Sequence, residues 1–156
     1  MDVGVNKNDW LDSMLTLLCL IGDTTKQLDV LERQESLPIS RVLAKAWNDA
    51  RLQEARQSVN DRMAVPPITV FGYRIQGETW YIPSDGNHRT VAAAEAGRRK
   101  IIAQVTGAVD CDMSRYVVKN GGLWIKDGGQ LTRLSRDKLS QKVIDLALKL
   151  GAEHHK

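Results

Sequence analysis

The chain has 156 residues, of which 42% are hydrophobic and 26% charged, which is the composition of an ordinary soluble globular domain. Its two cysteines lie far apart, which excludes a disulfide framework or a cysteine-rich metal site, and the apolar run at 15–21 is shorter than the about 20 residues that cross a bilayer. Because the chain also starts without the basic flank of a signal peptide, we expect one domain over residues 1–156, in the cytoplasm and without a membrane partner.

The net charge of +3 is unevenly distributed along the chain. Residues 1–64 carry a net charge of −2, residues 65–109 of +2 and residues 110–156 of +3. An anionic ligand is therefore to be sought in the later two thirds. Ordinary solvated surface explains the same distribution, and so small a net charge argues only weakly for a nucleic-acid partner.

The first predicted element is a helix over residues 10–21. Its apolar residues recur at helical spacing, which gathers them on one face. These residues are Trp10, Leu11, Met14, Leu15, Leu18 and Ile21. Such a face is usually buried within its own domain, and the alternative is a surface that docks a partner protein.

Further helical segments are predicted before the middle of the chain. One covers residues 25–34, with Leu28 and Leu31 turned inward. The next covers residues 38–62 and begins at a proline, which suits the first turn of a helix. Two offset apolar stripes indicate a break near residues 48–49, and so two helices. Residues 1–48 are therefore expected to form a helical extension.

The middle of the chain indicates a β-hairpin, a helix and a third strand. The predicted elements are a strand at 68–71, a turn at 76–78, a strand at 79–82, a helix at 89–96 that ends at Gly97, and a strand at 101–105. The last third predicts short strands at 116–118 and 123–125 around a glycine turn, and a final helix that Ser135 caps and Gly151 ends. Together these elements define an α+β fold with a small mixed sheet and packed helices.

The segment between the second predicted strand and the following helix has the form of an anion site. Backbone N–H groups and the positive end of the helix dipole meet at such a turn, where a phosphate is stabilised. Gly86 allows a sharp turn and a close approach to a ligand, and Asn87 tolerates left-handed backbone angles.

Polar side chains add to this turn. His88 and Arg89 offer a titratable ring and a planar fork of donors, Thr90 adds a hydroxyl, and Asp85 is placed to cap the helix or to hold a metal ion or a proton. A purely structural interpretation is also open. In it Asp85 is only a cap, His88 bonds a carbonyl, and Arg89 pairs with Glu95 or Asp85.

The order of these motifs resembles the N-terminal domain of ParB proteins and sulfiredoxins. The resemblance covers about residues 49–106: a leading helix, Val65-Pro66-Pro67-Ile68-Thr69-Val70, a hairpin, Asp85-Gly86-Asn87-His88-Arg89, an alanine-rich helix and a strand. It implies a ParB/sulfiredoxin-like core at 49–106, between the extension at 1–48 and a hairpin and helix at 107–156. It also implies that nucleotide phosphates bind at the helix start, with contacts from Arg51 and Ser58 on the leading helix.

The chain departs from both families at this core. Sulfiredoxins carry a cysteine where this chain has Asn87, so sulfinic acid reduction is not expected here. ParB partition proteins carry a glycine-glutamate-arginine-arginine core and a following helix-turn-helix domain, whereas only about fifty residues follow Val105. The chain therefore resembles the stand-alone ParB-like domains, some of which are linked to nucleotide hydrolysis, kinase activity, DNA cleavage or plasmid functions.

The first hypothesis is a nucleotide hydrolase or phosphotransferase that binds ATP or another nucleoside triphosphate with Mg²⁺. Positioning and charge neutralisation carry most of such catalysis. His88 is expected to donate a hydrogen bond or relay a proton, Asp85 or Glu78 to hold Mg²⁺ or act as base, and Glu54 is a further candidate. An aromatic wall for the base is sought among Tyr73, Trp80 and Tyr81.

Two other functions stay open. A DNA-binding protein or nuclease of a plasmid or mobile element would use the basic run at 98–100, although cations at a helix end also offset the helix dipole. A non-catalytic interaction or inhibitor module would dock a protein through the N-terminal helices, with Trp10 and the nearby leucines as anchors.

Overall fold

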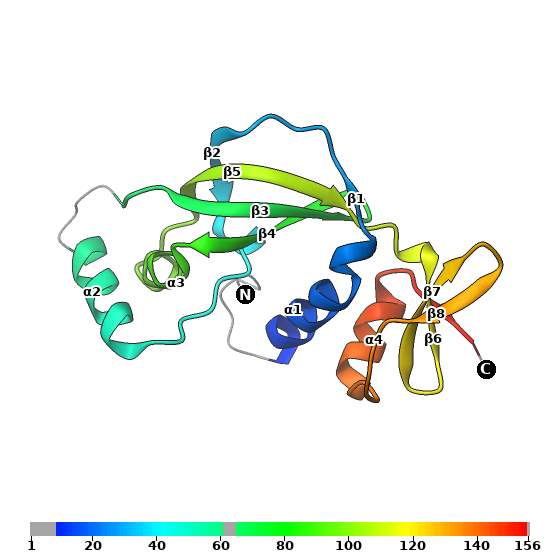
Figure 1. Ribbon diagram of the computed structural model, residues 1–156. Coiled ribbons are helices and arrows are strands. Elements are labelled where there is room, and N and C mark those ends of the chain that lie inside the picture. The colour runs from blue at the N-terminus through cyan, green and yellow to red at the C-terminus, as the bar shows by residue number, and fades with distance from the viewer. Residues whose placement is uncertain (1–8, 61–64, 156) are drawn as a thin grey trace.

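The computed structural model describes residues 9–60 and 65–155, which form an α+β fold of four α-helices and two sheets (Figure 1). The helices are α1 (Asp9–Ile21), α2 (Asp49–Asn60), α3 (Asn87–Glu95) and α4 (Gln141–Lys149), with short 3-10 helices at Gly22–Thr24, Ile39–Arg41 and Met113–Arg115. The strands are β1 (Lys26–Gln27), β2 (Arg33–Pro38), β3 (Ile68–Ile75), β4 (Glu78–Asp85), β5 (Lys100–Asp110), β6 (Tyr116–Lys119), β7 (Gly122–Asp127), β8 (Gln130–Arg133) and β9 (Glu153–His154). None of the described helices is long and apolar enough to span a membrane.

The first sheet carries α2 and α3 at one end, as Figure 1 shows. Its strands run in the order β1-β5-β3-β4, and β2 also pairs with β5. β3 pairs in parallel with β5 and antiparallel with β4, so the predicted hairpin and third strand are confirmed. Side chains of β3 and β5 alternate between buried and more exposed positions, as expected where helices cover one face of a sheet.

Helix α2 packs through an apolar stripe that follows helical spacing. Leu52, Ala55 and Val59 are its buried residues, and they join one hydrophobic core with Val91 of α3 and Ile68 of β3. This packing holds the two helices together over the end of the sheet. It therefore sets the distance between the polar side chains that α2 and α3 direct away from the core.

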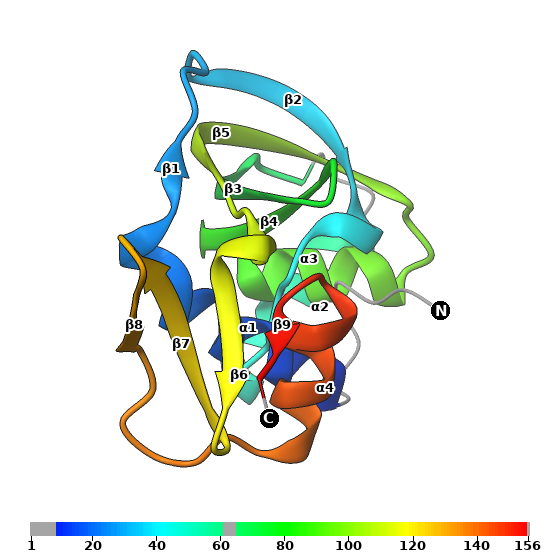
Figure 2. The ribbon, with the colours of Figure 1, turned by 90° about the vertical axis from the view of Figure 1, so that its right-hand side faces the viewer.

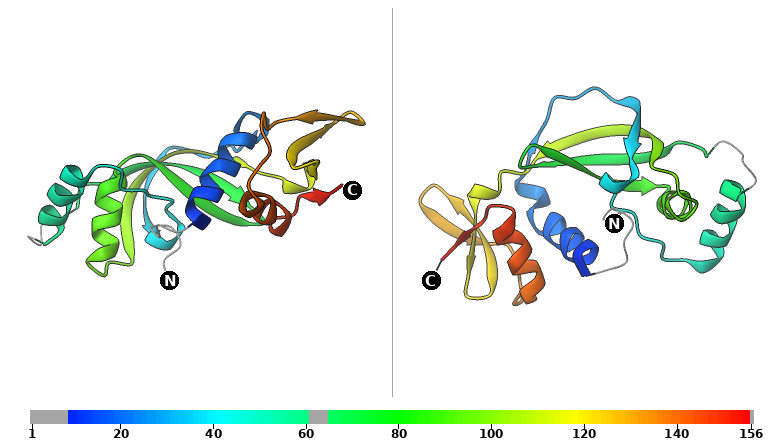
Figure 3. Two further views of the ribbon diagram at one scale, coloured as in Figure 1. Left: turned by 90° about the horizontal axis from the view of Figure 1, so that it is seen from below. Right: turned by 180° about the vertical axis from the view of Figure 1, so that it is seen from behind.

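The second sheet lies at the far end of the molecule from α2, which the two views of Figure 3 show. Figure 2 shows its strands side by side in the order β8, β7, β6, β9, with α4 beside them. Helix α1 packs against α4. Met14, Leu17 and Ile21 of α1 are fully buried in the core between these elements, and Leu18 is 2% exposed. Leu11, Leu17 and Leu18 are thus core residues. Trp10, Leu15 and Leu20 are partly buried and pack against the same core.

The helices expected over 25–34 and 38–48 are wrong. Strand β2 occupies residues 33–38 and pairs antiparallel with β5, while Leu31 is 84% exposed. The backbone hydrogen bonds of the sheet outweigh the weak helical propensity of this stretch. Of the two helices expected over 38–62, only the second is present, as α2, which begins at Asp49; the predicted end at Arg62 lies outside the described residues.

The final helix begins later than expected. Ser140 caps α4 by accepting a hydrogen bond from the backbone N–H of Val143. Ser135 is buried instead, where its hydroxyl oxygen accepts a hydrogen bond from the backbone N–H of Leu123 at 3.0 Å. Both serines accept a hydrogen bond from a backbone N–H. The donor to Ser140 lies in the helix that it caps, whereas the donor to Ser135 lies twelve residues earlier in the chain, so the sequence alone does not distinguish the two roles.

Candidate functional site

Gly86 connects β4 to α3 in a left-handed conformation that leaves no room for a β-carbon. Its φ is +104°, and a β-carbon there would lie 2.2 Å from Cγ2 of the buried Ile68. We expected the backbone at Gly86 to approach a ligand closely. It instead approaches the buried Ile68 of β3, and this contact places the first turn of α3 against the sheet.

The start of α3 carries uncompensated backbone donors. Gly86 is the N-cap, no side chain caps the helix, and its first turn contains no acidic residue. The first intrahelical bond runs from the N–H of Thr90 to the carbonyl of Gly86, so the N–H groups of Asn87, His88 and Arg89 have no intrahelical acceptor. The interpretation of Asp85 as the cap is therefore wrong, and this helix end is positively polarised.

A cavity of about 350 Å³ lies between α2 and the start of α3. Its polar lining residues are Arg51, Glu54, Ser58, Asp85, His88 and Arg89. The structure thus brings together residues that are far apart in the sequence and that the sequence analysis named as candidates. Two arginines and two carboxylates face one space, together with a hydroxyl group and an imidazole.

The side chain of Arg89 lines this cavity and also has one buried donor without a partner. Its Nη2 atom donates to the carbonyl of Pro67 and to the carboxylate of Asp85, each at 3.2 Å. Its Nε atom is buried and has no hydrogen-bond partner among the described residues. A buried donor left without an acceptor is costly, so the Arg89 guanidinium is only partly satisfied by the protein itself.

His88 is a buried, neutral imidazole. Its Nε2 atom accepts a hydrogen bond from the backbone N–H of Asn48 at 3.2 Å, so the ring proton is assigned to Nδ1. Burial lowers the pKa of His88, and the positive charge of Arg51 lowers it further. With Nε2 occupied, the ring offers a donor at Nδ1 rather than a free base.

Asn87 and Thr90 support the site without lining the cavity. The Asn87 Oδ1 atom accepts a hydrogen bond from the backbone N–H of Lys45 at 3.1 Å. Thr90 is fully buried, and its hydroxyl donates to the carbonyl of Gly86 at 2.8 Å. Their side chains therefore hold the local backbone, which differs from the phosphate contacts expected of them.

Glu78 does not lie at this cavity. It starts β4 while Asp85 ends it, and a strand of this length separates the two by about 23 Å at ~3.3 Å per residue. Glu78 instead pairs with Arg41 at 2.9 Å, which lowers the pKa of its carboxyl. The sequence-based role of Glu78 as a catalytic or metal-binding residue of this site is therefore wrong.

The aromatic residues expected to line a base pocket also lie elsewhere. Tyr73 packs on Phe71, Trp80 packs on Trp10, and Tyr81 is buried in the core. A different aromatic residue, Trp47, contacts two residues that line the cavity. Trp47 stands next to His88 and Arg51, and its expected place on a helix gave no reason to single it out.

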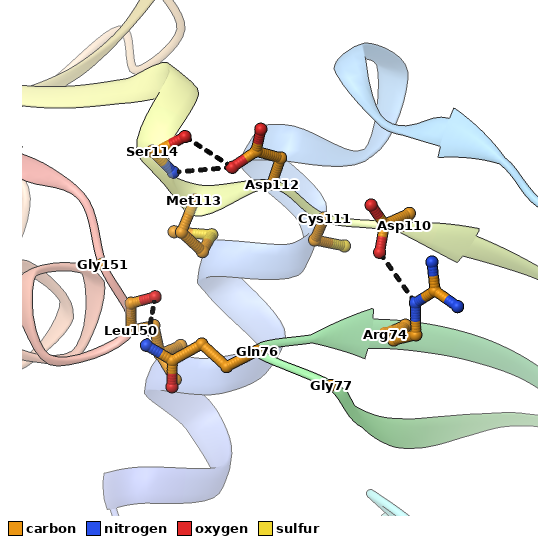
Figure 4. Close-up of a pocket in the computed structure, with 10 residues that line it drawn as sticks. All are labelled: Arg74, Gln76, Gly77, Asp110, Cys111, Asp112, Met113, Ser114, Leu150 and Gly151. Atoms are coloured by element: carbon orange, nitrogen blue, oxygen red, sulfur yellow. Dashed lines mark hydrogen bonds and ion pairs between the residues drawn. The ribbon is translucent and has the colours of Figure 1, made fainter.

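A larger cavity of about 630 Å³ lies where the β3–β4 turn, the end of β5 and the end of α4 meet (Figure 4). Its polar groups are bonded to each other: Arg74 to Asp110, Asp112 to Ser114, and Gln76 to the carbonyl of Leu150. Burial raises the pKa of the Cys111 thiol to about 11, which makes it a poor nucleophile. This cavity has neither a free cation nor a reactive thiolate, so the smaller cavity is the better candidate.

The smaller cavity has two carboxylates, so it would hold a Mg²⁺ ion only if a bound ligand supplied further oxygen atoms. The described residues contain no group of three or more His, Cys, Asp or Glu side chains that could hold a metal ion. Asp85 and Glu54 nevertheless both line the cavity. Mg²⁺ beside nucleotides is typically held by one or two carboxylates and the phosphates themselves, which matches this pair.

Comparison with known proteins gives a structural likeness alone. No family model and no curated protein matches the sequence. The crystal structure of sulfiredoxin from Arabidopsis thaliana matches with a TM-score of 0.38 and 20% sequence identity, covering 49% of this chain and 88% of that chain.

Proposed function

We propose that the chain binds the phosphate groups of a nucleoside triphosphate in the cavity between α2 and α3. The meeting of Arg51 and Arg89 in one cavity, beside the uncapped start of α3, carries this proposal. Helix N-termini and arginine side chains are the groups that proteins use most readily to hold phosphate oxygens.

Each polar group of the cavity has a role in this proposal. Arg89 and Arg51 supply positive charge from α3 and α2, Ser58 supplies a hydroxyl, and His88 supplies its Nδ1 proton. Asp85 and Glu54 would hold Mg²⁺, which neutralises phosphate charge when it is bound. Without the ion, the two carboxylates repel phosphate and weaken its binding.

Hydrolysis or phosphoryl transfer is a further step of the proposal. His88 is unsuited to act as the base, because the backbone N–H of Asn48 occupies its Nε2 atom. The remaining carboxylates are Asp85, whose side chain is 73% exposed, and Glu54. One of these two residues would orient the attacking water or hydroxyl group, a role that requires little proton transfer in phosphoryl chemistry.

Calorimetric titration with Mg²⁺ and ATP, CTP, GTP or UTP tests the binding proposal. We expect at least one nucleotide to bind, and Arg89→Ala and Arg51→Ala each to weaken binding about tenfold or more, as for the loss of a charge-assisted hydrogen bond. Arg136→Ala is the matched control, because Arg136 is exposed and lies outside the cavity. Cooperative thermal melts establish that each variant is folded.

Failure of all four nucleotides to bind the folded wild-type protein would overturn the proposal. Equal affinities of wild type, Arg89→Ala and Arg51→Ala would also overturn it, because the ligand would then bind elsewhere. If binding is confirmed, release of inorganic phosphate from the bound nucleotide measures turnover, which Asp85→Asn or Glu54→Gln is expected to reduce.

A further inference from the structure

Trp47 is an exposed tryptophan beside the candidate cavity. Trp47 is 62% exposed, whereas the rings of Trp10 and Trp80 contact each other at a tilted angle and pack against a hydrophobic core. Single exposed apolar residues are common and need no explanation by themselves. Trp47 differs because the surrounding chain holds it in a defined place.

Hydrogen bonds at both ends fix the segment that carries Trp47. The N–H of Lys45 donates to Asn87 Oδ1, and the N–H of Asn48 donates to His88 Nε2. Asn48 also caps α2 by accepting a hydrogen bond from the N–H of Arg51 at 3.0 Å. The indole is therefore held between the first turns of the two helices that form the cavity.

The indole also contacts two residues that line the cavity. Its ring centroid lies 4.9 Å from that of His88, edge to face, and the guanidinium carbon of Arg51 lies 4.8 Å from its centroid. Arg51 thus touches the tryptophan and the cavity at once. Trp47 stands at the rim, on the side where Arg51 and His88 meet.

The size of the cavity explains why an aromatic rim is useful. Its volume of about 350 Å³ is near the lower end of the range of ~300–1,000 Å³ for small-molecule sites, and its lining includes two arginines and two carboxylates. A triphosphate suits such a space, whereas a nucleobase would extend to the rim. Nucleobases stack on tryptophan because both present flat π-faces.

We infer that Trp47 stacks on the nucleobase, and that the ligand of the cavity is therefore a nucleoside polyphosphate rather than an inorganic phosphate or polyphosphate. This inference rests on the proposed phosphate binding. It adds a binding residue for the nucleobase, which the phosphate contacts do not hold. Arg51 packs on the indole and also lines the cavity, so it connects the stacking residue with the phosphate site. Stacking of this kind strengthens binding by roughly ten- to a hundredfold.

Calorimetry with Mg²⁺ and tripolyphosphate beside ATP, CTP, GTP and UTP separates the two parts of the ligand. We expect wild type to bind its preferred nucleotide at least tenfold more tightly than tripolyphosphate. Trp47→Ala is expected to remove most of that difference, because it weakens nucleotide binding much more than tripolyphosphate binding. Trp47→Phe retains a stacking surface and is expected to keep most of the difference.

Each other outcome is decisive. If wild type binds tripolyphosphate as tightly as every nucleotide, or if Trp47→Ala weakens both ligands equally, the stacking role is overturned while phosphate binding stands. If neither tripolyphosphate nor any nucleotide binds, both proposals are overturned. Quenching of indole fluorescence by the nucleotide provides an independent readout, expected to disappear in Trp47→Phe and to persist in Trp124→Phe.

Discussion

The Nε2 atom of His88 accepts a hydrogen bond from the backbone N–H of Asn48 at 3.2 Å. This bond ties the first turn of α3 to the N-cap of α2, and so it holds the two walls of the candidate cavity together. It also fixes the ring as a neutral acceptor, since a protonated Nε2 atom has no lone pair for the Asn48 donor.

The stability of the protein is therefore expected to fall on acidification through the titration of His88. Burial and Arg51 lower its pKa in the folded state below the ordinary value of 6.5, so the unfolded chain binds more protons in the interval between the two values. The contribution of neutral His88 is present above about pH 6.5 and is lost as pH falls through the folded pKa. Urea unfolding of wild type and His88→Gln between pH 5 and 8 measures it. Identical pH dependence of the two proteins would contradict this account.

Gly86→Ala is expected to destabilise the fold much more than Gly77→Ala. Both glycines have positive φ, but a β-carbon at residue 86 meets Ile68 at 2.2 Å, whereas residue 77 has nothing within 4 Å. The left-handed backbone costs about 1–2 kcal/mol at either position, and the clash adds roughly 1–3 kcal/mol at residue 86 alone. Denaturant unfolding compares the two variants, and equal losses would show that the contact with Ile68 is not tight.

The two cysteines are expected to react with a thiol reagent at very different rates. Cys19 is exposed, whereas Cys111 is buried and its pKa is raised to about 11. At pH 8 the thiolate fraction of Cys111 is on the order of one in a thousand. One thiol per chain should be modified rapidly, and Cys19→Ser should remove that phase. Two rapid equivalents in the folded protein would be inconsistent with the buried position of Cys111.

The carboxylates of the cavity are expected to act oppositely with and without Mg²⁺. In the presence of Mg²⁺, Asp85→Asn should weaken nucleotide binding about tenfold, the equivalent of 1.4 kcal/mol, because an ion ligand is lost. With the ion chelated, the same variant should bind at least as tightly as wild type, because a negative charge beside Arg89 is removed. Glu78→Gln is the control and should match wild type in both conditions. A loss of affinity for Asp85→Asn that is independent of Mg²⁺ would refute the metal role.

The hairpin, α3 and β5 were predictable because their signals are local. A β-branched run, a turn and a glycine after an alanine-rich helix each act over a few residues, and Gly97 closes α3 with a backbone bond from its N–H to Ala94. Strand β2 was not predictable in this way. Its partner β5 lies more than sixty residues later in the sequence, and residues 25–38 contain no local pattern that excludes a helix.

The candidate site was also predictable only in part. Arg51 and Ser58 were expected on one helix, and His88 and Arg89 at the turn and start of another, and the structure places all four on one cavity. Glu78 was wrongly expected near Asp85 because the two residues are close in sequence. They lie at opposite ends of the extended strand β4 and are therefore far apart in space. Trp47 had no sequence signal, since its position depends on hydrogen bonds from its flanking residues to α3.

Chemical-shift mapping by ¹H–¹⁵N NMR tests the central claim most directly, and a chain of 17.4 kDa is suited to it. On titration with Mg²⁺ and the preferred nucleotide, we predict that the largest saturable shifts cluster at the amides of residues 86–89 and at Arg51 and Ser58. Saturable shifts that cluster instead around Cys111 and the end of α4, or no shifts with any nucleotide, would contradict the assignment of this cavity as a phosphate site.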